Sequence, residues 1–369
     1  MILKQNSPTG SSTRCRSLLP LVTKAITNKR MKKITNISTL FNIVLAGLLL
    51  SSAAVHAQTP DYSRPFGYVK HTLKAGQFNL IGLTLHKPVI ISGAFEKVAM
   101  TTLTDNDVDF GARLTAGKTY ILEITGAAEQ SLNGAVQQVT TWSGNTLTTP
   151  DELGSDGLGV GDKYQLRAAV TIADLFGASN EAGLAATSKY SINEADVVYI
   201  PNAKGFDRVF YSSAAGEEGW YTSDFMPAGN IPIPYMDAVL VLRRGVADLD
   251  FVVFGSVKLT VTSLALTGGD FNYISTIFPV GSTLGNSGLE TSLRGTSDKN
   301  PNLADLVYMP DGAGGFNAYY YSNAEGDLKW YGLDGKDASN IPMQSGIVIY
   351  RRGTAKNAVI TPPASYSDL

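Results

Sequence analysis

An internal repeat is the feature that most restricts what this chain can fold into. The block Ala-Asp-Val-Val-Tyr-Ile-Pro at 195–201 returns as Ala-Asp-Leu-Val-Tyr-Met-Pro at 304–310. Five further matches follow in the same order at an offset near 109 residues: Gly205-Phe206 with Gly315-Phe316, Phe210-Tyr211-Ser212 with Tyr320-Tyr321-Ser322, Trp220-Tyr221 with Trp330-Tyr331, Asn230-Ile231-Pro232 with Asn340-Ile341-Pro342, and Arg243-Arg244-Gly245 with Arg351-Arg352-Gly353. This ordered set predicts two copies of one folding unit.

The repeat extends upstream, but at a different offset. Residues 76–81 match residues 269–274 at an offset of 193, which exceeds 109 by 84 residues. The first copy therefore contains an insertion. We predict module 1 at 58–248 with an inserted β-subdomain at about 89–170, module 2 at 249–355, and a C-terminal tail at 356–369.

The residue types within each copy are typical of β-structure. Residues 196–200 form a run rich in β-branched and aromatic side chains, and Pro201 ends the run because it cannot donate to a strand ladder. Residues 206–212 form a second such run after a turn. The insertion carries similar runs at 120–124, 134–142 and 164–167. We predict an all-β fold of two related sandwich-like or barrel-like modules, the first with an inserted β-subdomain. Only short helices are expected, at 150–153, 171–176 and 284–293.

The N-terminal region has the order of parts that is typical of a signal peptide. Lys32 and Lys33 form a basic head, an apolar stretch runs from Phe41 to Leu50, and cleavage after Ala57 would leave Gln58 first. The apolar stretch is too short to span a bilayer. We predict an upstream leader or a misassigned start at 1–30, a signal peptide at 31–57, and a product that is periplasmic, on the cell surface or extracellular, with no membrane span after cleavage.

Charge and cysteine content exclude several classes of function. Residues 1–57 hold 8 of the 30 basic residues and no acidic one, which leaves 22 basic and 32 acidic residues in 58–369, a net charge of about −10. Binding to nucleic acid needs basic residues to replace counterions, so we expect no nucleic-acid partner. The single cysteine, Cys15, precedes the predicted cleavage point, so the exported part has no disulfide and no thiol chemistry.

Few residues suit catalysis. His71 and His86 are the histidines after the predicted cleavage point, and His86, before Lys87-Pro88, is expected to be solvated. A nucleophilic triad needs a positioned imidazole or a thiol, so we predict no catalytic residue and no cofactor. Paired carboxylates could still cleave glycosides, although sequence does not select a pair.

Three sets of residues are candidates for other roles. The aspartates Asp105, Asp107 and Asp109 alternate as in calcium-binding loops, although a polar turn is the simpler interpretation. Four aromatic residues, which belong either to the module cores or to a platform for sugar rings, are Trp220, Tyr221, Trp330 and Tyr331. The residues expected to form structural ion pairs, with solvated strand ends as the alternative, are Asp196 with Arg243 or Arg244, and Asp305 with Arg351 or Arg352.

Several motifs together resemble an uncharacterised family of exported bacterial proteins with a repeated Ala-Asp-x-Val-Tyr-x-Pro β-module. The likeness covers nearly all of residues 58–369, and the family has no assigned activity, so it implies no functional residue. The motifs that carry it are Gly67-Tyr68-Val69, Leu73-Lys74-Ala75-Gly76, Leu85-His86-Lys87-Pro88, Ala116-Gly117-Lys118-Thr119-Tyr120, Val160-Gly161-Asp162-Lys163-Tyr164 and Ala195-Asp196-Val197-Val198-Tyr199-Ile200-Pro201.

The leading hypothesis is a non-enzymatic protein of the cell envelope or extracellular space that acts by binding or assembly, with an envelope component or a polysaccharide as partner. The first alternative is carbohydrate binding through the repeated aromatic residues. The second is a glycoside hydrolase that uses two carboxylates. Exposure of Trp220 and Trp330 separates the first two, because buried rings cannot stack on a sugar.

Overall fold

The computed structural model describes residues 65–367 and 369, which belong to one compact unit. Strands make up 42% of it, with two short α-helices in the described part of the chain, so the predicted all-β class is confirmed. The leader at 1–30 and the signal peptide at 31–57 lie outside the described residues. Among the described residues, no helix has the length and apolar character to cross a bilayer.

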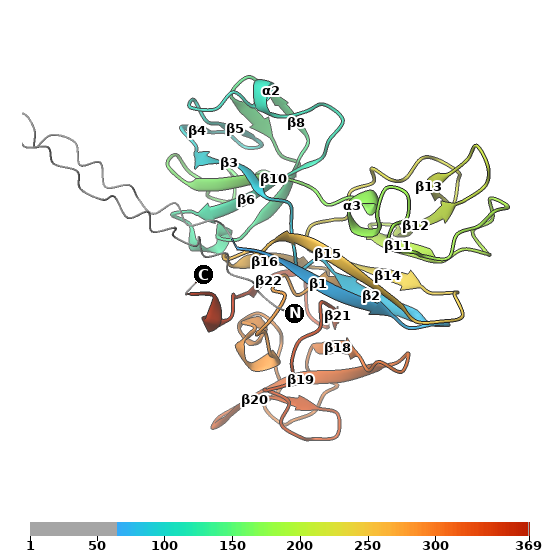
Figure 1. The fold of residues 1–369 in the computed structure, drawn as a ribbon. Coiled ribbons are helices and arrows are strands. Elements are labelled where there is room, and N and C mark those ends of the chain that lie inside the picture. Colours follow the sequence, from blue (N-terminus) through green and yellow to red (C-terminus); the bar gives the residue numbers. More distant parts are fainter. Residues whose placement is uncertain (1–64, 368) are drawn as a thin grey trace, which may run out of the picture. The chain divides into compact units, whose positions relative to one another are not determined.

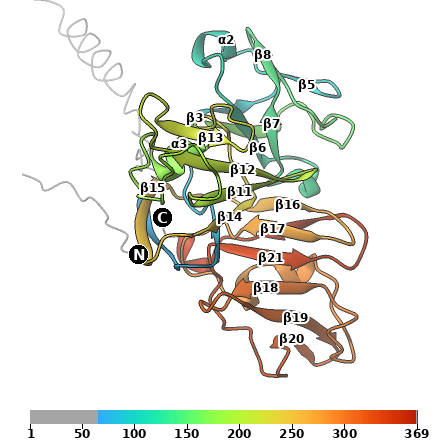
Figure 2. The same ribbon diagram turned by 90° about the vertical axis from the view of Figure 1, so that its right-hand side faces the viewer.

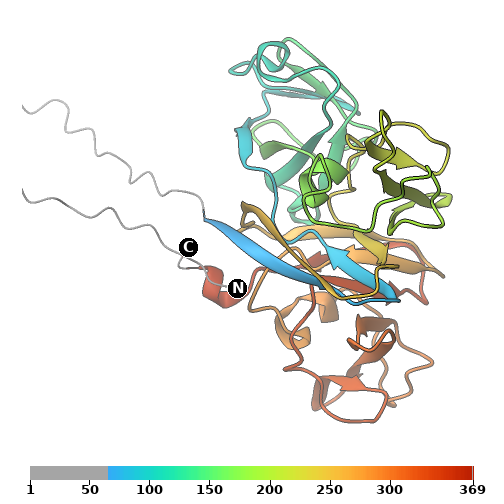
Figure 3. The same ribbon diagram turned by 45° about the vertical axis from the view of Figure 1, so that its right-hand side comes forward.

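Module 1 is built on a five-stranded antiparallel sheet in the order β13-β12-β11-β14-β2. Strand β1 pairs separately with β15 along eight residue pairs, and in Figure 3 β1 is the long blue strand. The short helix α3 (Ile172–Phe176) begins with a capping box at Thr171. The strands are β1 (Phe66–Leu73), β2 (Phe78–Gly82), β11 (Val197–Asn202), β12 (Gly205–Ser212), β13 (Gly219–Thr222), β14 (Ala238–Leu242) and β15 (Leu249–Ser256).

Module 2 has a five-stranded sheet in the order β20-β19-β18-β21-β17, whose strands lie side by side in Figure 2. Strand β16 pairs separately with β22. Its strands are β16 (Thr262–Leu266), β17 (Phe271–Ser275), β18 (Leu306–Pro310), β19 (Phe316–Ala324), β20 (Asp327–Gly332), β21 (Gly346–Tyr350) and β22 (Lys356–Ile360), and its 3₁₀ turns are η2 (Leu284–Asn286), η3 (Leu289–Thr291) and η4 (Ala364–Tyr366).

Corresponding strands of the two sheets have the same order and register. Leu80 of β2 lies opposite Leu240, and Tyr273 of β17 lies opposite Val348. Local hydrogen bonds repeat as well. Asn79 Oδ1 accepts from the backbone N–H of Lys74 at 2.7 Å, and Asn272 Oδ1, 193 positions later, accepts from the backbone N–H of Thr267 at 2.7 Å. Corresponding positions in the two sheets can therefore be compared residue by residue.

The insertion forms a lobe of two four-stranded sheets, ordered β3-β10-β6-β7 and β4-β5-β9-β8. Its strands, cyan to green in Figure 1, share an apolar core that includes Phe95, Leu122 and Tyr164. The elements are β3 (Val89–Ala94), β4 (Lys97–Val98), β5 (Thr102–Thr104), α2 (Phe110–Arg113), β6 (Tyr120–Gly126), η1 (Gln130–Leu132), β7 (Val136–Val139), β8 (Thr141–Ser143), β9 (Thr146–Thr148) and β10 (Lys163–Ala168).

Strand pairing corrects several predicted boundaries. Because β15 pairs with β1, residues 249–256 belong to module 1 and not to module 2, and because β22 pairs with β16, residues 356–360 are not part of a tail. Pro201 does not end its strand, since it pairs with Phe206 and the strand runs one residue further. Residues 150–153 form no helix, and 284–293 contains two 3₁₀ turns.

Candidate functional site

A groove of about 380 Å³ lies where β1 and β2 of module 1 face three segments of module 2. The module 2 wall comprises the segment after β17, the β18–β19 turn and the residues before β21. We call this the inter-module groove. Its lining residues are Val69, Lys70, His71, Thr72, Lys74, Gln77, Phe78, Asn79, Leu80, Ile81, Thr84, Phe278, Pro279, Pro310, Gly312, Gly314, Gly315, Phe316, Met343, Gln344 and Ser345.

The module 1 wall follows from strand periodicity. Phe78 and Leu80 are two residues apart on β2, so their side chains share one face, while the next residue, Ile81, is buried in the module core. Phe78 keeps 52% of its surface exposed and contacts Tyr199 edge-on, with ring centroids 5.5 Å apart. The groove therefore has an aromatic side chain that is partly open to solvent.

The module 2 wall depends on a glycine-rich turn between β18 and β19. The carboxylate of Asp311 accepts hydrogen bonds from the backbone N–H groups of Ala313 (2.7 Å) and Gly315 (2.9 Å). Gly314 has φ of 95°, which a side chain disfavours, and a Cβ there would lie 2.5 Å from Oε1 of Gln77. The positive φ therefore favours glycine at this position, and the turn leads into Phe316, which is 44% exposed.

The charges at the groove are paired. Lys70 forms an ion pair with Asp250 at 2.6 Å, and Lys74 forms one with Asp248 at 2.7 Å. The hydrogen bond to Asp248 raises the pKa of Lys74, and its lysine partner lowers the pKa of Asp248, so both stay charged at neutral pH. The described lining residues include no Asp or Glu.

A histidine, His71, also lines the groove. Its ring is half-buried and stacks on Phe251, with centroids 5.3 Å apart. Burial lowers the pKa of His71 to about 4, so the imidazole is neutral at physiological pH. A neutral histidine and two neutralised lysines favour an uncharged ligand over an anion.

The aromatic residues predicted as a sugar platform are mainly core residues. Trp220 is 4% exposed and donates from Nε1 to the carbonyl of Gly177 at 2.8 Å, and Trp330 is 1% exposed. Tyr331 is buried too, whereas Tyr221 is half-buried against Tyr190. The platform prediction is wrong for both tryptophans, because their faces pack against the module cores and cannot meet a sugar ring.

The structure only partly brings together the three aspartates that resemble a calcium loop. Carboxylates of Asp105, Asp107 and Glu96 lie within 4.8 Å of one another, whereas Asp109 caps α2 by accepting from Ala112 at 3.1 Å. Asp105 already accepts from the Tyr164 hydroxyl (2.6 Å) and from the N–H of Asp107 (2.9 Å). These bonds account for the cluster as a polar turn.

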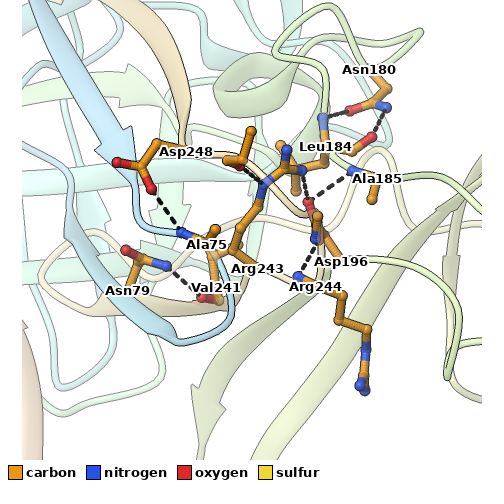
Figure 4. A network of polar contacts seen from close by, with 12 residues as sticks. Ala75, Asn79, Asn180, Leu184, Ala185, Asp196, Val241, Arg243, Arg244 and Asp248 are labelled. Carbon is orange, nitrogen blue, oxygen red and sulfur yellow. Dashed lines mark hydrogen bonds and ion pairs between the residues drawn. The ribbon is translucent and has the colours of Figure 1, made fainter. Parts of the chain in front are cut away.

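The predicted ion pairs are present in both modules. Arg243 Nη1 donates to Asp196, and Arg351 Nη1 donates to Asp305, while both carboxylates are 1% exposed. Figure 4 shows that Asp196 also accepts from the backbone of Arg244 at 2.6 Å. The first arginine of each pair therefore supplies the charge, and the second contributes its backbone N–H; Arg352 repeats this contact at 2.8 Å with Asp305. Their role is structural, at the end of a core strand.

Sequence reasoning missed a buried polar cluster between the insertion and the modules. Glu123 of β6 is fully buried and pairs with Arg167 (3.1 Å) and with Lys258 (2.7 Å), which lies between β15 and β16. His86 stacks on Tyr235 at 4.4 Å. A glutamate inside the apolar run 120–124 was the available signal for this cluster.

His86 is buried in this cluster, so the prediction that it would be solvated is wrong. It is 2% exposed, and neither ring nitrogen forms a hydrogen bond of good geometry. Burial, followed by the positive charges of Arg167 and Lys258, lowers the pKa of His86 well below its usual value, and the backbone of Ile277 only partly opposes this. His86 is therefore a neutral structural residue.

Comparison with known proteins adds no identification: no family model, no curated protein and no solved structure matches this chain. The geometry of the inter-module groove is therefore the basis for a functional proposal.

Proposed function

We propose that this chain is an exported, non-enzymatic protein of the cell envelope or extracellular space that acts by binding, with its ligand in the inter-module groove. The observation that carries the proposal is the groove itself: about 380 Å³, bordered by Phe78 and Phe316 and by amide side chains. This volume falls in the range of small-ligand sites, which combine apolar walls with a few polar groups. The basic head and apolar run of 31–57 support export.

Carbohydrate binding remains the second candidate, but through different aromatic residues. Phe78 and Phe316 keep 52% and 44% of their surfaces exposed, unlike the two buried tryptophans. Amides such as Gln344 can hydrogen-bond hydroxyl groups. A hydrolase has no support from this groove, because the described lining residues lack a carboxylate.

Export is tested by expressing the full chain with a C-terminal tag in a Gram-negative host. We expect the product in the periplasm or the medium, with an N-terminal sequence that begins at Gln58. A cytoplasmic product that keeps residues 31–57 would contradict export.

Binding through the groove is tested with a glycan array and immobilised envelope polysaccharide. Phe316→Ala removes an aromatic wall, and Leu328→Ala is a matched control because Leu328 is 65% exposed and does not line the groove. We expect Phe316→Ala to weaken retention at least tenfold and Leu328→Ala to leave it unchanged. Equal retention by both variants, or no retention of the wild type, would count against the proposal.

A further inference from the structure

The two modules meet at two corresponding places. At the first, which borders the groove, the N–H of Gly82 donates to Oγ of Ser345 at 3.3 Å. At the second, the N–H of Ser275 donates to the carbonyl of Met236 at 2.8 Å. Gly82 and Ser275 occupy the same register position, because they lie opposite Ala238 of β14 and its counterpart in β21. We call the second place the closed interface.

Aromatic rings fill the closed interface. Tyr273 of β17 contacts Phe206 edge-on, with ring centroids 5.2 Å apart and an interplanar angle of 73°. Next to the strand ends, Tyr235 stacks on His86 at 4.4 Å. Edge-on and offset contacts are the arrangements that aromatic rings prefer. This interface therefore supplies its own ring partner for Phe206.

The groove keeps one ring of this arrangement and lacks the others. Phe316 corresponds to Phe206, since each lies opposite the proline of the neighbouring strand. Leu80 stands at the register position of Tyr273, and counting from the paired strands places Met343 at the position of Tyr235 and Pro279 at that of His86. Leu80 thus stands where the ring of Tyr273 would contact Phe316, whereas Met343 and Pro279 replace a pair of rings that packs against the insertion in module 1.

We propose that the inter-module groove binds an uncharged phenolic ring, placed edge-on against Phe316 where Tyr273 stands in the closed interface. This rests on the proposed function and names the ligand class for that groove. A phenolic hydroxyl would meet the amides of Gln77 or Gln344, which line the same space. The lysines at the groove already form ion pairs with Asp248 and Asp250, so the ligand needs no anionic group to balance their charge.

The ring can come from a free phenol or from a tyrosyl side chain in a peptide, and two probes separate these sources. The probe p-cresol offers the ring alone, and N-acetyl-L-tyrosinamide adds peptide-like amides. Each is titrated into the full chain and followed by ligand-observed NMR and calorimetry. We expect saturable binding of one equivalent of probe. Binding of N-acetyl-L-tyrosinamide but not of p-cresol would assign the ring to a tyrosyl side chain in a peptide.

The deciding variant is Leu80→Tyr, which supplies from the chain the ring that the closed interface has. We expect it to reduce affinity for the probe at least tenfold, while Leu80→Met keeps the groove open and retains affinity. Tyr273→Leu is the matched control, because Tyr273 does not line the groove. The affinity of this variant for the probe should equal that of the wild type. Circular dichroism verifies that each variant is folded.

Failure of this inference can be told apart from failure of the proposed function. Absence of binding of both probes, or an unchanged affinity of a folded Leu80→Tyr, would overturn the phenolic assignment. If a saccharide binds and Phe316→Ala abolishes that binding while both phenols fail, the groove remains the ligand site and the ring class is wrong. If nothing binds in a manner that depends on Phe316, both proposals fall.

Discussion

Removing Arg351 should expose the energetic importance of the buried ion pairs. Asp305 is 1% exposed, and without the guanidinium of Arg351 it would keep only backbone donors, from Arg294 at 2.7 Å and from residue 352 at 2.8 Å. Breaking one side of a buried pair costs about 3–5 kcal/mol because the remaining charge is uncompensated. A Coulomb estimate of about 4 kcal/mol at 4 Å and an effective dielectric constant near 20 agrees.

The assay is thermal unfolding followed by circular dichroism and scanning calorimetry. At about 2 °C per kcal/mol for a chain of this size, Arg351→Met should lower the midpoint by about 6–10 °C. Lys189→Met is the control, because Lys189 pairs with Glu194 at 3.2 Å on the surface, where a pair contributes less than about 1 kcal/mol.

A double-mutant cycle then tests the mechanism. Asp305→Asn removes the charge and keeps an acceptor oxygen for one of the two backbone donors, which bind different carboxylate oxygens. Asp305→Asn/Arg351→Met should still be less destabilised than the sum of its single variants by about 2 kcal/mol or more. Arg243→Met should parallel Arg351→Met, since Arg243 pairs with Asp196 in the same way. Additive effects, or a midpoint for Arg351→Met no lower than that of Lys189→Met, would refute the reasoning.

Three further predictions follow from buried groups. The folded pKa of His86 lies well below 6.5, so below pH 6.5 the unfolded chain binds a proton that the folded chain does not. As the pH drops below 6.5, the free energy of unfolding should therefore decrease by up to about 1.4 kcal/mol per pH unit. His86→Phe should reduce this slope in denaturant titrations, and an unchanged slope would contradict the prediction. Trp330→Ala should cost about 3–5 kcal/mol in urea unfolding, whereas an unchanged stability would show that Trp330 is not a core residue. Because Asp105 already accepts two hydrogen bonds, exchanging Ca²⁺ for EDTA should leave the melting midpoint unchanged; a rise of several degrees with Ca²⁺ would establish a metal site.

Sequence patterns predicted the features that depend on local order. The Ala-Asp-x-Val-Tyr-x-Pro blocks predicted strands, and the Arg-Arg pairs predicted the partners of Asp196 and Asp305, because a charged residue beside an apolar strand needs a nearby counter-charge. The ring of Trp220 could not be placed in the same way. A repeated aromatic residue fits a core and a binding surface equally, and only packing decides between them.

The inter-module groove could not be predicted because it arises from contacts between distant segments. Leu80 and Phe316 are 236 positions apart, and nothing in either local sequence shows that they border one space. The repeat did hold part of the information, since aligning Leu80 with Tyr273 reveals a ring missing from the first copy. The buried trio of Glu123, Arg167 and Lys258 was hidden for the same reason, because it joins the insertion to the segment between β15 and β16.

The most direct test of the groove as a ligand site uses protein labelled with ¹³C at the methionine methyl groups. Met343 lines the groove, whereas Met100 and Met226 are 57% and 63% exposed and do not line it. On titration with N-acetyl-L-tyrosinamide, the Met343 signal should shift and saturate while the other two stay in place. Shifts confined to Met100 or Met226 would place the ligand outside the groove and contradict the account, and a Met343 signal that stays in place would contradict the binding of a phenolic ring there.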